Sequence, residues 1–184
     1  MSWQRPNGPA WRTVRARAGA LLVLGAAALG AGAPPALRAQ DYTLLGQPAP
    51  DFALRAAAGG NVRLSEHRGE VVVLSFWSSR CTPCRAQLSA LDRSLRTYAS
   101  AGLSVYGVGV DDEPERARDF VHAAAVSFPM LLDPDKSVSR SYQVDNLPMT
   151  VLIDRNGTVR YVLRDYSQAS QALYLQRLRA LLNE

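Results

Sequence analysis

The chain has 184 residues, 47% of them hydrophobic and 20% charged, and carries a formal net charge of +5. That excess is confined to the N-terminus: five arginines and no acidic residue precede Gln40, so the remainder carries 16 basic and 16 acidic groups. Nucleic-acid binding would call for a basic face on the folded part, so the charge gives no support for a nucleic-acid partner. The part after Ala39, about 145 residues, is long enough for one domain with its own core.

The first 39 residues have the layout of a secretory signal peptide. A basic segment ending at Arg17 precedes the uncharged residues 18–33, and Pro34-Pro35 and small residues follow up to Ala39. Sixteen helical residues span roughly 24 Å, less than the hydrocarbon core of about 30 Å. We therefore expect cleavage near Ala39, with anchoring through residues 18–33, or a wrongly assigned start codon, as alternatives. A cleaved or anchored protein would place residues 40–184 in the periplasm or another extracytoplasmic space.

A β-hairpin and a buried strand are predicted next. Residues 52–54 and 62–64 flank Gly59-Gly60-Asn61, which is typical of a hairpin with a loose turn. Residues 71–77 form a nearly continuous apolar run, which indicates a strand buried on both faces of a sheet.

The only two cysteines of the chain follow that strand. Cys81 and Cys84 precede Leu88, Leu91 and Leu95 at helical spacing, so both sulfurs are predicted to lie at a strand-to-helix junction. Unpaired peptide N–H groups and the helix dipole favour a thiolate there, and the thiolate is the nucleophile in disulfide exchange.

The two cysteines are predicted to have different roles. We expect Cys81 to be exposed and acidic, and Cys84, one helical turn later, to be more buried and able to resolve a mixed disulfide. Pro83 suits the first helical turn, where a missing N–H costs little. A redox-active disulfide between Cys81 and Cys84 would then be the redox centre, with no cofactor and no metal.

Further helices and strands complete an alternating pattern. The helix from Thr82 is expected to end near Gly102, and the acidic residues 111–113 to cap the next helix rather than to bind a metal. Asn156-Gly157 predicts a second hairpin. The remaining predicted elements are strands 103–110, 128–132, 149–153 and 158–163, a helix over 135–142, and a terminal helix that buries Leu175, Leu178 and Leu182.

These motifs resemble a known family. The run Phe-Trp-x-x-x-Cys-x-Pro-Cys-Arg, residues 76–85, resembles the thioredoxin-like active site and is closest to the TlpA/ResA group of extracytoplasmic thiol-disulfide oxidoreductases in the redoxin superfamily. Residues 46–52 are similar to the N-terminal redoxin motif, and residues 146–154 to the cis-proline strand. The resemblance covers roughly residues 47–157. It implies an α/β thioredoxin-like fold: a central mixed β-sheet flanked by helices, with an N-terminal β-hairpin and a central insertion at about residues 128–142.

The resemblance also implies a site and partners. Leu147 and Pro148 would lie opposite Cys81, where the peptide before a cis-proline pairs with an extended substrate. The predicted substrate-binding residues are Trp77, Arg80, Pro83, Leu147 and Pro148. The partners would be protein thiols and disulfides, apocytochrome c among them in cytochrome c maturation, and a membrane electron-transfer thiol protein.

Some positions depart from the family pattern. Arg80 replaces the usual tryptophan, and a guanidinium beside Cys81 favours thiolate and a higher reduction potential, as in an oxidant or isomerase. Ser75 and Gln87 stand where carboxylates occur in thioredoxins and in ResA-like proteins respectively, so Cys84 has no evident general base.

Four other functions are possible for a pair of cysteines, and the sequence fits each of them less well. A zinc site would have only Cys81, Cys84, His67 and His122 as ligands, without a second pair at ligand spacing. A purely structural disulfide would close too short a loop to stabilise much. A copper chaperone resembling the Sco group would have three residues between its cysteines, not two. A peroxiredoxin-like thiol peroxidase is the main alternative, but its Pro-x-x-x-Thr-x-x-Cys motif reads Leu74, Ser78 and Cys81 here, without the proline.

Overall fold

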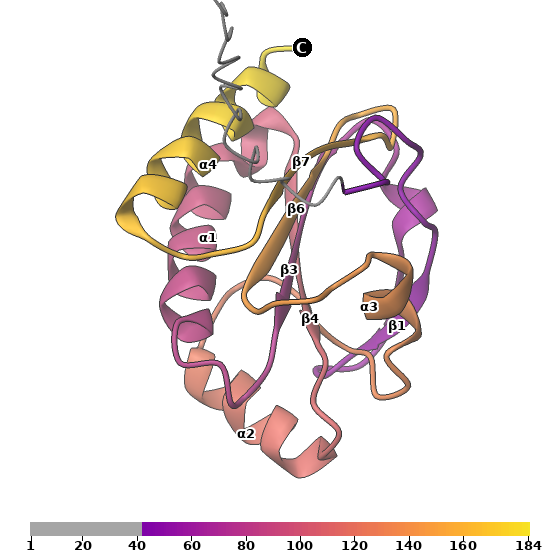
Figure 1. The fold of residues 1–184 in the computed structure, drawn as a ribbon, viewed down its shortest axis with the longest axis vertical. Helices are drawn as coiled ribbons and strands as arrows, with labels where there is room; N and C mark the ends of the chain where they lie inside the picture. The colour runs from indigo at the N-terminus through magenta and orange to yellow at the C-terminus, as the bar shows by residue number, and fades with distance from the viewer. Residues whose placement is uncertain (1–41) are drawn as a thin grey trace, which may run out of the picture. The chain divides into compact units, whose positions relative to one another are not determined.

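The computed structural model describes residues 42–184, which form an α/β fold of the predicted class (Figure 1). The predicted signal peptide or anchor, residues 1–39, lies outside the described residues. A mixed sheet has the strand order β2-β1-β5-β4-β3-β6-β7. The strands are β1 (Ala53–Ala56), β2 (Asn61–Arg63), β3 (Val71–Trp77), β4 (Leu103–Gly109), β5 (Met130–Leu132), β6 (Met149–Ile153) and β7 (Val159–Leu163). The helices are α1 (Cys84–Tyr98), α2 (Pro114–Ala124), α3 (Ser137–Ser141) and α4 (Gln168–Leu182), with short 3₁₀ turns at Leu64–His67 and Ala99–Ala101.

Strand β3 lies at the centre of the sheet and leads into the cysteines. All seven of its residues are buried, as its continuous apolar sequence predicts for a strand covered on both faces. It pairs in parallel with β4, with Trp77 opposite Gly109, and antiparallel with β6, with Phe76 opposite Met149. The hairpins β1–β2 and β6–β7 form as predicted.

Two separate hydrophobic clusters cover the two faces of the sheet. Helices α1, α2 and α4 pack on one face, with Leu88, Phe120 and Leu178 in the cluster. Helix α3 and the segment leading into β1 pack on the other face, through Tyr142 and Phe52. Figure 1 shows α1 and α4 side by side on one side of the sheet and α3 on the opposite side. Because both faces are covered, the chain becomes accessible only after the C-terminal end of β3, where the cysteines follow.

Two helix predictions differ from the structure. Helix α1 begins at Cys84 and not at Thr82, and Pro83 occupies the N-cap position. Helix α4 buries Tyr174, Leu178 and Leu181, while Leu175 and Leu182 are only partly buried. The buried face of α4 is therefore shifted by one residue from the predicted one at both ends, and the aromatic ring of Tyr174 takes the buried place that was expected for Leu175.

None of the helices within residues 42–184 combines the length and the apolar character needed to cross a membrane.

Candidate active site

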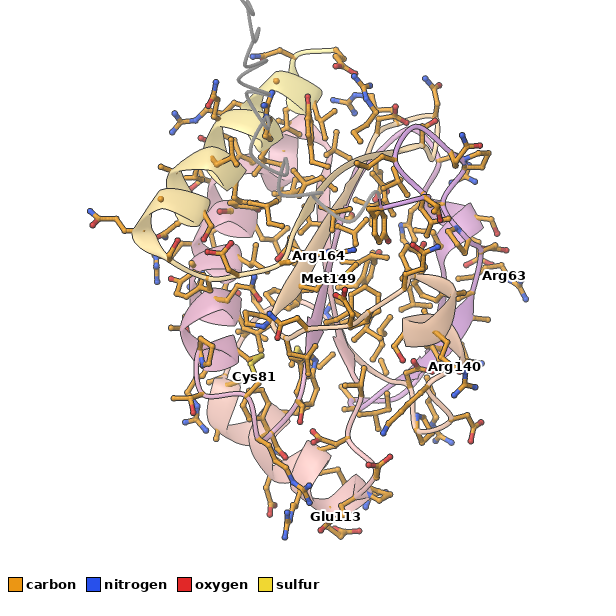
Figure 2. All side chains as sticks on the ribbon, viewed as in Figure 1. Arg63, Cys81, Glu113, Arg140, Met149 and Arg164 are labelled. Carbon is orange, nitrogen blue, oxygen red and sulfur yellow. A yellow bond between two sulfur atoms is a disulfide. The ribbon has the colours of Figure 1, made fainter. Side chains whose placement is uncertain are left out.

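Cys81 and Cys84 are joined by a disulfide at the junction of β3 and α1. Cys84 is fully buried, whereas Cys81 is partly exposed, which is the order of accessibility that the sequence predicts. Figure 2 shows Cys81 toward the end of the molecule at which Glu113 also lies. An incoming thiolate can therefore reach Cys81 but not Cys84.

A short turn carries the chain from β3 to the disulfide. The Cys81 N–H donates to the carbonyl oxygen of Ser78 at 3.0 Å, and the Cys84 N–H donates to that of Cys81 at 3.2 Å. The first turn of α1 contains no acidic side chain. The positive end of the helix dipole is therefore not offset within its own first turn, and it favours a thiolate at Cys81.

The turn is held by Asp111, a residue that the sequence analysis assigned to capping. One Asp111 carboxylate oxygen accepts from the hydroxyl groups of Ser78 at 2.7 Å and Ser79 at 2.9 Å, and the other accepts from the Ser79 N–H at 2.8 Å. The acidic run does lead into α2, whose N-cap residue is Glu113, but no side chain caps the helix, so the capping prediction was wrong for Asp111. Among residues 42–184 no group of three or more metal-ligating side chains comes together.

Arg80 points into an ion pair and not at a free sulfur. Its guanidinium lies 2.9 Å from the carboxylate of Glu113, whose other oxygen lies 2.8 Å from Arg116. The Arg80 side chain is 72% exposed. Both the acid and the solvent therefore weaken the effect of this cation on the Cys81 sulfur.

A groove of about 480 Å³ runs past the exposed cysteine. Cys81, Arg80, Ser78 and Leu147 are among the residues that line it. The remaining lining residues are Val110, Lys136, Ser139, Val144, Asp145 and Asn146. The peptide bond between Leu147 and Pro148 is cis, and Pro148 is buried behind the half-buried Leu147. The structure thus brings together Cys81, Arg80 and Leu147 on one surface.

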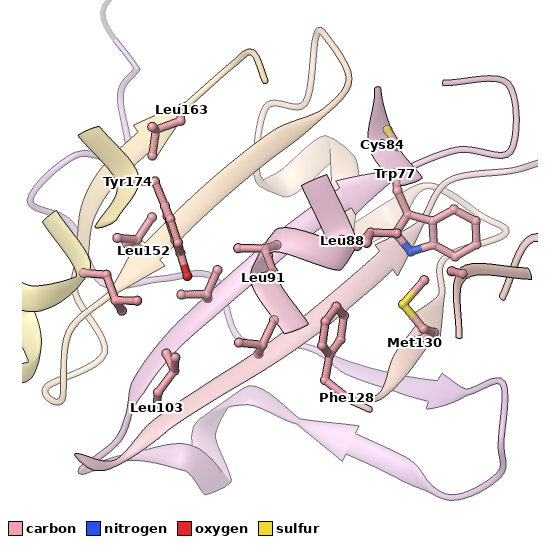
Figure 3. Packing of buried hydrophobic residues seen from close by; sticks show 14 of the residues in the cluster. Trp77, Cys84, Leu88, Leu91, Leu103, Phe128, Met130, Leu152, Leu163 and Tyr174 are labelled. Carbon is pink, nitrogen blue, oxygen red and sulfur yellow. The ribbon is translucent and has the colours of Figure 1, made fainter. Parts of the chain in front are cut away.

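Trp77, predicted to bind substrate, is fully buried and cannot touch a substrate in this structure. Its indole stacks on Phe120, with ring centroids 4.6 Å apart, and lies so close to Gly109 that a Cβ there would meet it at 2.6 Å. Figure 3 shows Trp77 beside Met130 and close to Cys84. Trp77 is therefore part of the hydrophobic core next to Cys84 and not of the surface around the disulfide. Pro83, by contrast, is exposed beside the cysteines.

A neutral hydrogen-bond network lies under helix α1. Ser75, Gln87 and Thr150 are all buried, and the Gln87 side chain accepts from Ser75 at 3.0 Å and donates to Thr150 at 2.6 Å. None of these three side chains titrates in the physiological range. None of these three side chains can therefore act as a general base for Cys84.

The positions that correspond to the peroxidase motif are occupied differently. Leu74 is fully buried within β3, and the hydroxyl group of Ser78 is engaged by Asp111. Neither side chain is available to position a peroxide next to Cys81.

Comparisons with known proteins agree with this geometry. Residues 45–162 match the AhpC/TSA family. Thiol-disulfide oxidoreductase ResA of Geobacillus kaustophilus is 33% identical over 119 residues, which cover 65% of this chain and 68% of ResA. ResA of Bacillus subtilis is 33% identical over 114 residues, 62% of this chain and 64% of ResA. A crystal structure from Chlorobium tepidum, assigned as thiol:disulfide interchange protein DsbE, is 34% identical with a TM-score of 0.72, and covers 75% of this chain and 97% of its own.

Proposed function

The chain belongs to the AhpC/TSA family and is a thiol-disulfide oxidoreductase, and from this premise we propose that it exchanges disulfides with protein thiols outside the cytoplasm through Cys81 and Cys84. The observation that carries the proposal is the disulfide itself, with Cys81 partly exposed on a groove and Cys84 buried behind it. This asymmetry supports Cys81 as the attacking sulfur and Cys84 as the resolving sulfur.

The exchange runs in two steps from the oxidised protein. A substrate thiolate attacks the sulfur of Cys81, a substrate–Cys81 bond forms, and the Cys81–Cys84 bond breaks to release the Cys84 thiolate, which takes a proton. A second substrate thiolate then attacks the substrate sulfur of the mixed disulfide. The substrate leaves with a disulfide, and Cys81 leaves as a thiolate. Two electrons have moved from substrate to protein, and the reverse sequence reduces a substrate disulfide.

The groove supports binding of an extended segment of the substrate. Leu147 takes part in none of the backbone–backbone hydrogen bonds found within residues 42–184, so its N–H and C=O face no competing partner there. An extended peptide can therefore add alongside Leu147, with its own cysteine sulfur next to Cys81. Pro83 and Arg80 would contact the same segment from the other side.

The proposal also includes the cellular location of the protein and its redox partners. We place the domain on the extracytoplasmic side, secreted or anchored through residues 18–33, with apocytochrome c as a substrate and a membrane thiol protein as electron donor. Support comes from the similarity to proteins named ResA and DsbE, and from the layout of residues 1–39. A fusion of residues 1–40 to a reporter active only outside the cytoplasm tests the location, and cytoplasmic retention would contradict it.

The exchange itself is tested by trapping. Cys84→Ser should accumulate a mixed disulfide between Cys81 and a cysteine-containing peptide, because the resolving sulfur is gone. Cys81→Ser should not, because the remaining sulfur is buried. Equal trapping by both variants, or by neither, would overturn the assignment of roles.

The direction of electron flow is tested by titrating the Cys81–Cys84 couple against glutathione and dithiothreitol. A potential well below that of glutathione supports a reductant fed from the membrane, whereas a higher one supports an oxidase or isomerase. If no reversible two-electron transition occurs, the exchange proposal fails. Consumption of hydrogen peroxide at a rate comparable to disulfide exchange would instead favour the thiol peroxidase.

A further inference from the structure

Three consecutive acidic residues follow β4, and each binds a different neighbour. Asp111 binds the turn before the disulfide, Asp112 pairs with Lys136 at 2.6 Å, and Glu113 pairs with Arg80. Glu113 is the N-cap residue of α2, but no side chain caps that helix, so capping does not explain the contacts of Asp111. Of the three, only Asp111 reaches the backbone next to Cys81, so its role needs a separate explanation.

Asp111 engages the turn through three hydrogen bonds at once. Its carboxylate accepts hydrogen bonds from the Ser78 hydroxyl group, the Ser79 hydroxyl group and the Ser79 N–H, all within 2.9 Å. The Ser78 hydroxyl oxygen in turn accepts from the Arg80 N–H at 3.2 Å, and the Ser78 carbonyl oxygen accepts from the Cys81 N–H. A single carboxylate on a neighbouring strand end therefore fixes the chain up to Cys81.

This arrangement acts on the reaction in two ways. Hydrogen bonds to an ionised carboxylate are stronger than neutral ones, so they keep the turn in place when the disulfide opens and no longer restrains Cys81. Correct placement of a reacting atom lowers the activation barrier, because the entropy cost of orienting that atom for attack has already been met in the folded protein. The negative charge of Asp111 has the opposite effect on the reaction, because it disfavours formation of a thiolate at nearby Cys81. The geometric and electrostatic effects can be separated experimentally.

We propose that Asp111 is a positioning residue for disulfide exchange, which holds the Ser78–Ser79 turn so that the Cys81 sulfur stays in front of helix α1 in the reduced protein. The proposal rests on the role of Cys81 as the attacking sulfur. Asp111 itself touches neither substrate nor sulfur in this role. It acts through the turn.

The test compares Asp111→Ala, Asp111→Asn and Asp112→Ala in the full-length reduced protein. The rate of attack on oxidised glutathione is followed against pH, which gives a maximal rate and a midpoint. We expect Asp111→Ala to lower the maximal rate at least about fivefold and to move the midpoint to lower pH, since both geometry and charge are lost. Asp111→Asn should move the midpoint equally and keep most of the rate, because the amide oxygen can accept from the Ser79 N–H while its NH₂ donates to the hydroxyl groups.

Asp112→Ala is the matched control, because it removes the same charge one residue away without touching the turn. Its side chain is 74% exposed, so its maximal rate should equal that of the unaltered protein. An unchanged maximal rate in Asp111→Ala would overturn the proposal, even if the midpoint moved, because the effect would then be that of the charge alone. If that variant does not fold, Ser78→Ala combined with Ser79→Ala removes two of the contacts and must lower the maximal rate, or the proposal fails. Failure of the unaltered protein to exchange would instead count against the proposed function.

Discussion

The side-chain amide of Gln87 donates to the hydroxyl group of Thr150 at 2.6 Å across the interface between α1 and β6. The same side chain accepts from Ser75 in β3, so one uncharged group joins a helix to two strands. Gln87 lies three residues after the fully buried Cys84 on α1. This network therefore neither supplies nor takes the proton that Cys84 exchanges during the reaction.

Gln87→Glu places an ionisable carboxyl group in that network. Its oxygens can accept from Ser75 and, after rotation of the hydroxyl group, from Thr150. We expect the resolving step by Cys84 to accelerate several-fold at neutral pH, because a nearby general base takes the proton. Burial of a charge should also lower the free energy of unfolding by about 1–3 kcal/mol at pH 7. Stopped-flow decay of a preformed mixed disulfide and urea denaturation measure the two effects.

The pH dependence of this variant has a defined sign. Burial raises the pKa of the new carboxyl group in the folded state, so the folded variant binds the proton more tightly than the unfolded chain. Relative to the unaltered protein, the variant should therefore lose stability as the pH rises above about 4.3, the usual pKa of a glutamate. Gln176→Glu on the exposed face of α4 is the control and should change neither property. An unaltered resolving rate would mean that proton removal does not limit that step.

Arg80 and Glu113 are expected to shift the reduction potential in opposite directions. Arg80→Ala removes a cation near Cys81, but the guanidinium is 72% exposed and paired, so the potential should fall by less than about 30 mV. Glu113→Gln leaves that cation unpaired and should raise the potential. Arg118→Ala, an exposed ion-paired arginine on α2, is the control. A rise with Arg80→Ala, or a fall with Glu113→Gln, would contradict the electrostatic role of Arg80. Both potentials come from the glutathione titration.

Much of the site follows from local sequence. The apolar run of β3 predicts a strand covered on both faces, and a Cys-x-Pro-Cys sequence after it predicts a disulfide at a helix start. Each of these features depends on residues close together in the chain. The cis bond before Pro148 was implied by the family resemblance and not by the residues alone, since most X-Pro bonds are trans.

The features that sequence did not predict depend on distant contacts. Asp111 lies 33 residues from Ser78, and the sequence groups it with Asp112 and Glu113 as the acidic start of α2. Only the parallel pairing of β3 with β4 brings the two strand ends together. Trp77 was predicted to be buried with the rest of β3, and it is, but the substrate-binding role also predicted for it does not fit a ring that Phe120 of α2 covers. A polar residue just after the strand next to the cysteine strand was the available signal for Asp111.

Leu147 provides a test of the groove. Leu147→Asp should raise the KM for a protein disulfide about tenfold, since losing roughly half of the buried area of a leucine costs about 1.4 kcal/mol. The new carboxylate should also lower the reduction potential slightly, because a negative charge near Cys81 disfavours the thiolate, so the KM is the measurement that tests the groove. Leu173→Asp alters an exposed leucine on α4 and should leave the KM unchanged. An unaffected KM in Leu147→Asp would show that substrates do not use this side of the groove.

Asp92 should make the stability of the domain depend on acid pH. This carboxylate of α1 is nearly buried, and it accepts from the Ser127 N–H at 2.7 Å and from the Arg96 side chain at 2.6 and 2.9 Å. Burial raises its pKa, but the hydrogen bonds from Ser127 and Arg96 outweigh burial and hold the pKa below the ordinary value of 3.8. A carboxyl group with a lowered pKa in the folded state contributes stability that is present above pH 3.8 and lost as the pH falls through the folded-state pKa.

Asp92→Asn removes this contribution. We expect the free energy of unfolding at pH 7 to fall by about 1–3 kcal/mol, because the amide cannot accept from Ser127 and Arg96 together with the same strength. The difference from the unaltered protein should shrink as the pH is lowered below 3.8, because the unfolded chain then binds a proton at this carboxylate before the folded protein does, and it should vanish below the folded-state pKa, where both states are protonated. Asp119→Asn on the exposed face of α2 is the matched control. Urea denaturation between pH 2.5 and 7 measures the difference, and a difference that stayed constant over this range would mean that Asp92 stabilises the helix by packing and not by its charge.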